Sequence, residues 1–284
     1  MLSAEVDTVA VEAGIVDTPG FRVVHERTNT VLTHTSARSC ARVPPIQETQ
    51  QETAHTLHVV EMLAAQNAAV LPPAYPTPVP LPSGRNVTFW PLASPMSSAS
   101  VTNQEMADAI LSLHQTEPDL SMREWRYSEA LSRHHLEKAR QAEVPDVLIT
   151  RLEDLLERTL FAVQIKDIEP HTAVHANAFP EKMVRHEGVI KLIDCDQTGF
   201  GPPEQDLATV VHNCRRYPAS TTEYGFLTCY NGEYDEELLQ RLVKLREVAS
   251  IIWLASMHGT KVRALGEVQH RMETLNTSHR WHLT

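Results

Sequence analysis

The chain has 284 residues, of which 42% are apolar, and it carries a formal net charge of −11. This length is enough for one large domain or for two lobes. No run of about 18 apolar residues occurs, so we expect no membrane helix. The acidic balance argues against a general affinity for nucleic acid and would suit a cationic ligand.

The first third of the chain predicts a small lobe that is rich in strands. Residues 21–45 are rich in Val and Thr and are broken by polar turns, which predicts two or three antiparallel strands. Residues 46–68 carry apolar side chains at helical spacing and predict a helix. The prolines of residues 70–85 predict an extended connector, and residues 86–92 predict one more strand.

The remainder of the chain predicts a larger, mainly helical lobe. Residues 189–196 predict one short buried strand within it. We therefore predict an α+β fold with lobes at 1–93 and 94–284 and a linker near 93–102. Helices are predicted over residues 103–117, 128–143, 145–163, 203–217, 235–259 and 261–275.

The cysteines and the N-terminus indicate where the protein acts. Cys40, Cys195, Cys214 and Cys229 lack Cys-x-x-Cys spacing, which is typical of reduced thiols in the cytoplasm. The first residues are acidic and lack a basic region followed by an apolar stretch, so we expect no secretory signal. We therefore expect a cytoplasmic protein.

A pair of acidic residues is the first candidate for a functional site. The stretch "LIDCD" places Asp194 and Asp196 at the end of a short apolar strand, and alternation predicts both carboxylates on one side. Two like charges repel unless a cation or a donor lies between them, and Mg²⁺ with bound phosphate is the usual solution. The alternative is a pair of aspartates that caps the turn ahead of "QTGFGPP".

The order of several motifs resembles the aminoglycoside phosphotransferase and choline kinase-like family, a branch of the protein kinase-like fold. "ERTNTVLTH" is similar to its nucleotide-covering hairpin, "CARV" to its third strand and "VTFWPLAS" to its hinge strand. "HANAFPEKMV" stands in the place of the catalytic loop, "LIDCDQTGFGPPEQDLA" resembles the metal-binding segment, and "LREVASIIWLAS" resembles a late helix. The resemblance implies a two-lobe kinase-like fold that binds ATP, Mg²⁺ and a small-molecule substrate.

The catalytic loop of that family usually reads H-G-D-x-H-x-x-N, and this chain departs from it at the working positions. His175 keeps the opening His, whereas Asn177 stands at the catalytic Asp and Lys182 at the metal-binding Asn. A start at His171 would put alanine at both positions, so neither alignment restores the motif. We prefer the start at His175, because the distance to "LIDCD" then fits the family better.

Other positions can be assigned by the same resemblance. Arg42 stands where the family has its phosphate-binding Lys, and Asn29 lies in the nucleotide-covering hairpin. The Glu that partners the Lys would fall near Thr56, and Glu52, one turn earlier on the same helix face, could replace it. Asp206 matches the Asp that braces the catalytic loop.

The substitutions damage chemistry more than binding. An Asn can orient a substrate hydroxyl but cannot usefully accept its proton, and general-base catalysis is typically worth on the order of 10²–10⁴ in rate. An ammonium at a metal-ligand position repels Mg²⁺, or it replaces a cation by pairing with Asp194 or a phosphate. Arg42 keeps a charge that can hold phosphate.

Three hypotheses for function follow. The first is a pseudokinase that binds a nucleotide, a small ligand or a protein partner but transfers little or no phosphate. The second is an active small-molecule kinase in which Glu181 serves as the base. The third is a metal-dependent hydrolase that uses His171 and His175 with the two aspartates, which would require helical i, i+4 spacing of the histidines.

The stretch "GEYDEELL" at residues 232–239 has two interpretations. Its carboxylates would suit the N-terminus of a helix, where they face the positive end of the helix dipole. In family members that take amino sugars, acidic side chains of the helical lobe hold the ammonium groups, and Glu233, Asp235, Glu236 and Glu237 could do the same here.

Overall fold

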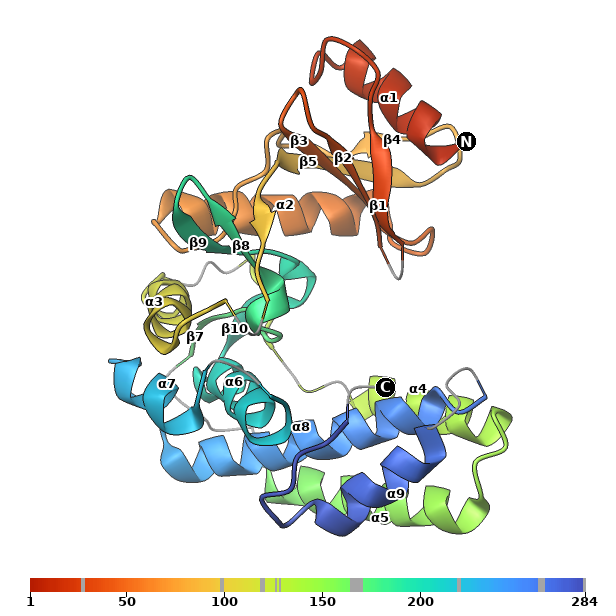
Figure 1. Ribbon diagram of the computed structural model, residues 1–284, viewed down its shortest axis with the longest axis vertical. Helices are drawn as coiled ribbons and strands as arrows, with labels where there is room; N and C mark the ends of the chain where they lie inside the picture. Colours follow the sequence, from red (N-terminus) through yellow and green to blue (C-terminus); the bar gives the residue numbers. More distant parts are fainter. Residues whose placement is uncertain are drawn as a thin grey trace.

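The structure is a computed structural model with two lobes, one rich in strands and one mainly helical (Figure 1). This is the kinase-like arrangement that the motif order predicts. The structure describes residues 1–26, 29–97, 100–117, 121–125, 127, 129–163, 171–218, 221–259 and 264–282.

The small lobe is built on a five-stranded antiparallel sheet in the order β1-β2-β3-β5-β4. Three strands fall in the Val- and Thr-rich stretch of residues 21–45 and one falls in residues 86–92, as predicted, while the two-residue strand β4 lies in the stretch predicted as a connector. Alternate side chains of β2 and β3 are buried. The strands are β1 (Arg22–Glu26), β2 (Thr30–His34), β3 (Ser39–Val43), β4 (Val79–Pro80) and β5 (Asn86–Pro91).

The sheet is covered by a helix that the sequence analysis did not predict. Helix α1 (Leu2–Glu12) buries Val6, Val9 and Ala10 against the sheet residues Phe21 and Phe89. The Asp7 carboxylate accepts hydrogen bonds from the backbone N–H groups of residues 20 and 21, which ties the helix to the first strand. The acidic N-terminus is therefore a structural part of the small lobe.

Helix α2 (Gln50–Ala65) links the small lobe to the large one. It starts at a capping box, in which the Thr49 side chain accepts from the Glu52 N–H and the Glu52 carboxylate accepts from Thr49. Its buried residues Val59, Val60 and Leu63 belong to the apolar core of the large lobe. The lobe boundary at residue 93 stays a prediction. The two apolar cores do not divide at that residue, because α2 precedes it and already packs into the core of the large lobe.

The large lobe packs its helices around one long central helix. Helix α8 lies against α4, α5, α6 and α9, and its buried face carries Leu242, Leu245 and Ile252 (Figure 1). The helices are α3 (Asn103–His114), α4 (Glu129–Gln141), α5 (Asp146–Ala162), α6 (Glu204–Arg216), α7 (Glu223–Cys229), α8 (Glu236–Ser256) and α9 (Ala264–Thr274). The strands are β6 (Ser94–Pro95), β7 (Thr172–Val174), β8 (Met183–His186), β9 (Val189–Leu192) and β10 (Gly199–Gly201).

The acidic stretch before α8 caps that helix. The Asp235 carboxylate accepts hydrogen bonds from the N–H groups of Glu237 and Leu238, at 2.8 and 3.1 Å. Its own N–H donates to Glu204 at 2.5 Å. Of the two interpretations of this stretch, the helix cap is the one that the structure confirms.

All four cysteines are free thiols, and burial raises the pKa of Cys40 to about 11 and that of Cys195 to about 12. Both thiols are therefore protonated and poor nucleophiles at neutral pH. Of the residues that the structure describes, no helix combines the length and the apolar character needed to cross a membrane.

A buried arginine fixes the C-terminal segment to the large lobe. The Arg216 guanidinium donates to the Glu247 carboxylate at 2.6 Å and to the carbonyl oxygens of Leu275 and Thr277 at 2.8 and 2.9 Å. It also lies 4.4 Å from the ring centre of Trp281. One side chain thus joins α6, α8 and the last turns of the chain.

We predict that Arg216→Met destabilises the fold by about 3–5 kcal/mol, because it leaves the Glu247 carboxylate buried without its partner. The free energy of unfolding is measured by urea denaturation. The matched control is Arg241→Met, which removes an exposed pair with Glu237 and is expected to cost less than about 1 kcal/mol. Equal losses in the two variants would contradict this role of Arg216.

Candidate functional site

The loop that follows β7 is held by one buried carboxylate. Asp206, on the first turn of α6, accepts hydrogen bonds from the N–H of His175 at 2.8 Å and from the N–H of Ala176 at 2.7 Å. The His114 ring lies 3.2 Å from the same carboxylate, and its other nitrogen lies 2.7 Å from the Tyr230 hydroxyl. Asp206 therefore braces the loop as its match to the family predicts.

The loop backbone turns sharply at Ala176, which has a φ of +64°. Glycine adopts this left-handed conformation without a steric cost, whereas a residue with a Cβ is strained by roughly 1–2 kcal/mol. The two hydrogen bonds to Asp206 hold Ala176 in this conformation. The backbone route therefore persists although the usual Gly is absent.

The loop lies beside the strand that carries the acidic pair. The His175 ring nitrogen Nε2 lies 2.9 Å from the carbonyl oxygen of Ile193, and the Ile193 N–H donates to the Lys182 carbonyl at 2.9 Å. The residues expected at the catalytic loop and at the metal-binding segment are thus neighbours in space.

The two aspartates lie close together, but alternation along a strand, the predicted reason, is wrong. Strand β9 ends at Leu192, so alternation along a strand does not reach Asp194 and Asp196. Asp194 has a left-handed φ of +65°, and Cys195–Gln197 form a short 3₁₀ turn. The turn rather than the strand brings the two carboxylates to one place.

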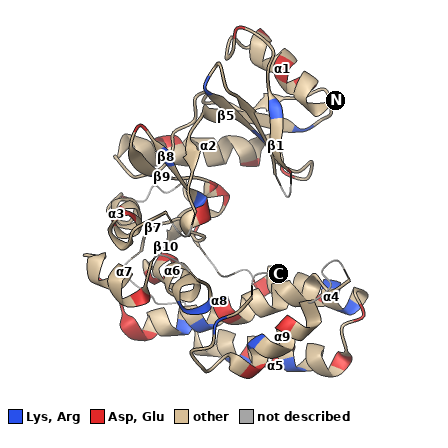
Figure 2. Cartoon of the chain, viewed as in Figure 1, with Lys and Arg blue, Asp and Glu red and all other residues tan. Residues whose placement is uncertain are grey.

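Both aspartates are neutralised by cations of the chain itself. The Arg42 guanidinium, from β3 of the small lobe, hydrogen-bonds Asp196 and lies 3.6 Å from Asp194. The Lys182 ammonium pairs directly with Asp194. Figure 2 shows acidic and basic residues together at this junction of the two lobes.

The two carboxyls respond differently to this environment. Burial acts to raise the pKa of Asp194, but the Lys182 ammonium and then the Arg42 guanidinium outweigh it and hold the pKa below its ordinary value. Burial raises the pKa of Asp196 to about 6, with Arg42 opposing the shift and Asp194 adding to it. Asp194 is thus the more firmly ionised member of the pair.

Asn177, at the position that the resemblance assigns to the catalytic base, contacts an arginine that was not among the predicted site residues. The Asn177 Oδ1 accepts a hydrogen bond from Nη2 of Arg246 at 2.7 Å, and its N–H donates to His175 Nδ1 at 3.3 Å. Arg246 lies on α8, between the buried residues Leu245 and Glu247. The available signal was a basic residue within "LREVASIIWLAS", the stretch that resembles a late helix of the family.

Three other candidates lie apart from this arrangement. Glu52 does not partner Arg42 as expected, because its carboxylate serves the capping box of α2. Glu181 is exposed on the 3₁₀ turn Pro180–Lys182, and its side chain has no hydrogen bond among the described residues. Asn29 lies directly before β2, and its Oδ1 is buried without a hydrogen-bond partner in the described chain.

The hydrolase hypothesis loses its geometric basis. His171 and His175 flank β7 instead of lying on a helix, so the three extended residues between them hold their backbones about 13 Å apart. His175 is buried and bonds within its own loop. The described residues contain no group of three or more His, Cys, Asp or Glu that could hold a metal ion.

The site residues fit the nucleotide that the resemblance implies better than they fit the metal. A divalent cation fits poorly, because Arg42 and Lys182 already balance the two carboxylates. A phosphate group fits better, because the Nε of Arg42 is buried and lacks a hydrogen-bond partner among the described residues. The described residues therefore offer a donor for phosphate but no free ligand set for magnesium.

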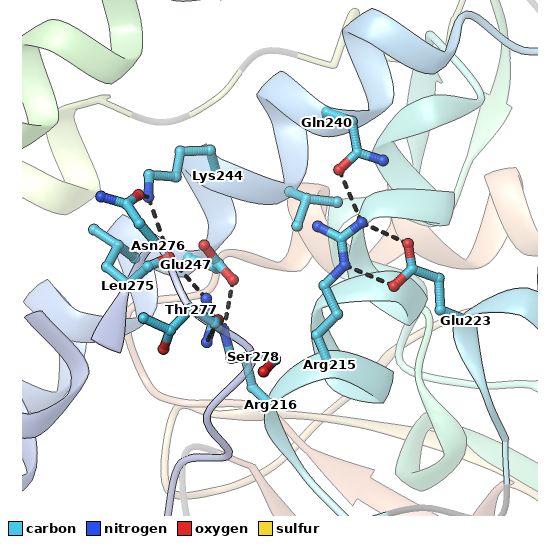
Figure 3. A pocket seen from close by; sticks show the side chains of 11 residues that line it. Arg215, Arg216, Glu223, Gln240, Lys244, Glu247, Leu275, Asn276, Thr277 and Ser278 are labelled. Carbon is cyan, nitrogen blue, oxygen red and sulfur yellow. Dashed lines mark hydrogen bonds and ion pairs between the residues drawn. The ribbon is translucent and has the colours of Figure 1, made fainter. Parts of the chain in front are cut away.

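A cavity of about 510 Å³ lies elsewhere in the large lobe and shares no residue with this site (Figure 3). Its charged walls satisfy one another, since Arg215 pairs with Glu223 and Lys244 donates to Asn276. The lining residues are Arg215, Arg216, Glu223, Gln240, Val243, Lys244, Glu247, Leu275, Asn276, Thr277 and Ser278.

The braced loop, the acidic turn and the arginine from the small lobe together define a protein of the two-lobe kinase class. The comparison with family models is specific: the model of the phosphotransferase enzyme family matches residues 21–238. The chain therefore belongs to the phosphotransferase enzyme family. No curated protein matches the chain.

Solved structures of small-molecule kinases share the fold at low sequence identity. A choline/ethanolamine kinase family protein from Mesorhizobium loti is 15% identical, with 97% of this chain and 95% of that chain covered and a TM-score of 0.63. An amicoumacin kinase solved with AMP-PNP, Ca²⁺ and Ami is 15% identical over 90% and 87%, with a TM-score of 0.66. A choline kinase from Streptococcus pneumoniae is 13% identical over 95% and 99%, with a TM-score of 0.62.

We predict that Asp206→Asn destabilises the protein by about 3 kcal/mol, because an amide NH₂ would face a loop N–H that needs an acceptor. The measurement is the free energy of unfolding in urea. The control is Asp108→Asn on the exposed face of α3, where we expect a change within about 0.5 kcal/mol. A loss at position 206 no larger than at position 108 would show that Asp206 does not hold the loop.

We predict that Lys182→Met strengthens binding of Mn²⁺ in the absence of nucleotide by at least about tenfold. The change removes the ammonium from Asp194 and leaves a carboxylate that an ion can occupy. Electron paramagnetic resonance of free Mn²⁺ measures the binding. Lys191→Met on β9 makes the same change in net charge away from the pair, so equal effects of the two variants would exclude a specific role of Lys182.

Proposed function

We propose that this member of the phosphotransferase enzyme family has impaired or absent phosphate transfer and acts as a pseudokinase-like binder of a nucleotide or small ligand. The observation that carries the proposal is the ion pair between Lys182 and Asp194. It puts a permanent cation of the chain at the place where an active member of the family would need its metal.

The electrostatics of the site support this proposal. Two cations and two carboxylates of the chain sum to zero before any ligand arrives. A divalent ion 4 Å from the Lys182 ammonium is repelled by about 8 kcal/mol at an effective dielectric constant of 20. Metal binding would therefore require the Lys182 side chain to leave Asp194.

The position of the base points in the same direction. An amide cannot take the proton of a substrate hydroxyl, and here the amide oxygen is already bound by Arg246 at 2.7 Å. The positive charge of the Arg246 guanidinium would also disfavour the transfer of a proton to this position. Both the proton acceptor and the metal ligand of the usual chemistry are therefore missing from their positions.

Nucleotide binding is the activity that the remaining residues support best. Arg42 has a buried Nε–H without a partner in the described residues, and the amicoumacin kinase of similar fold was solved in complex with AMP-PNP. A phosphate that accepts from this N–H would satisfy a donor that the folded chain leaves open. We propose ATP as this ligand, with magnesium bound weakly at most, and we propose a small molecule as the second ligand.

An active kinase is the second candidate that the sequence leaves open. Its proposed base, Glu181, lies exposed on the turn after Phe179, and no contact joins its side chain to Asn177 among the described residues.

The free cysteines suit the reducing cytoplasm, where we propose that the protein acts.

We predict that the double variant Asn177→Asp/Lys182→Asn transfers phosphate from ATP at least about 100-fold faster than the native chain. It restores the two working residues of the loop, and a general base alone is typically worth on the order of 10²–10⁴. The assay measures ADP release with a panel of alcohols and amino sugars, and a thermal-shift titration with ATP confirms that each variant binds nucleotide.

The single variants act as controls, since each restores only one function and should gain less than the double variant. The proposal is wrong if the native chain phosphorylates a member of the panel rapidly and Asn177→Asp changes that rate little.

A further inference from the structure

Arg246, which is half-buried, differs from two buried arginines of the large lobe. Arg216 and Arg271 each donate to a carboxylate, Glu247 and Glu267, at 2.6 and 2.8 Å. Arg246 has one hydrogen bond within the described chain, from Nη2 to the neutral amide oxygen of Asn177. Within the described residues it makes no ion pair, so it is the one of these three arginines whose charge no carboxylate contacts.

The groups around Arg246 do not balance its charge by direct contact. Asp206 lies close enough to favour the charged form, but the N–H groups of the loop and the His114 ring already occupy its carboxylate. The Tyr217 hydroxyl also favours the charged form, whereas His212 stays neutral, because burial and neighbouring arginines lower its pKa well below the usual value. The net effect of burial lowers the pKa of Arg246 to about 10.

The Asn177 side chain extends this donor character. Its oxygen accepts from Arg246, which leaves its NH₂ group as a donor, and this group has no acceptor among the described residues. The Arg246–Asn177 pair therefore presents N–H groups only. A substrate hydroxyl needs an acceptor for its proton, whereas a carboxylate or a phosphate needs donors.

We propose that the small molecule bound at this site carries an anionic group, a carboxylate or a phosphate, that the Arg246 and Asn177 side chains bind together. The inference rests on the proposed function, because it uses the replaced base as a binding residue. It replaces the cationic ligand that the net charge suggested. Asp235, the acidic residue at the start of α8, is used as a helix cap.

The anionic group could belong to the nucleotide or to the second ligand, and we assign it to the second ligand. Arg42 approaches from β3 of the small lobe and has its own open N–H for a nucleotide phosphate. Arg246 approaches from α8 in the large lobe, on the side of the loop brace Asp206. Two cations from two lobes thus offer separate places for two anions.

The test measures the midpoint of thermal unfolding during titration with inorganic phosphate and with acetate, against sodium chloride at matched ionic strength. We expect one or both anions to stabilise the native protein more than chloride does. Arg246→Met should weaken the binding of that anion at least tenfold. Arg241→Met, which removes an exposed arginine of the same helix, should leave it unchanged.

A second variant covers the case in which Arg246→Met folds poorly. Asn177→Asp keeps the arginine and gives it a carboxylate of the chain, so it should raise the midpoint without added anion and lose the response to phosphate and acetate at least tenfold. No stabilisation of the native protein beyond that by chloride, or equal responses of native protein and Asn177→Asp, would overturn the inference.

Saturation with AMP-PNP separates the two sources of the anion. If the response to phosphate or acetate persists with AMP-PNP bound, the site belongs to the second ligand, as proposed. If AMP-PNP abolishes it, the assignment to the second ligand is overturned. Rapid ATP turnover by the native chain would refute the proposed function but not the anion site. The anion site is tested separately, by the titrations with phosphate and acetate.

Discussion

The hydrogen bonds that Asp206 accepts from the loop are the constraint on which the site depends. They hold Ala176 in a left-handed conformation, and that turn directs the next residues towards the junction of the lobes. Asn177 thereby meets α8, and Lys182 meets Asp194. The brace thus gives the loop a defined shape, and the side chains that the brace positions set the chemistry of the loop.

The pairing of Arg42 with the two aspartates has a mechanical consequence as well as an electrostatic one. Arg42 belongs to the sheet of the small lobe, and Asp196 belongs to the turn in the large lobe, so the ion pair joins the lobes directly. Its side chains are partly exposed, which limits the strength of each bond in water. A phosphate that draws Arg42 away would loosen this connection, so the nucleotide binding that we propose would be coupled to the relation of the lobes.

Much of the fold could be predicted from the sequence, because alternation and helical spacing are local signals. The strands of residues 21–45 and most helices of the large lobe lie where those signals place them, whereas the short helix α7 was not predicted. Helix α1 was missed, since its buried face is small and its N-terminus is acidic. In the site, motif order identified Asp194, Lys182 and Asp206. The contact of Arg246 with Asn177 spans 69 residues, and no local pattern encodes it.

The two substitutions in the loop make physical sense as one change. With an aspartate at position 177, Arg246 would face a carboxylate and the two charges would cancel. With Asn177 that carboxylate is gone, and the arginine keeps its charge. Lys182 adds a cation of the chain in the same loop, in contact with Asp194. Relative to the residues that the family usually has, both make the site more positive, which favours the anion binding that we propose.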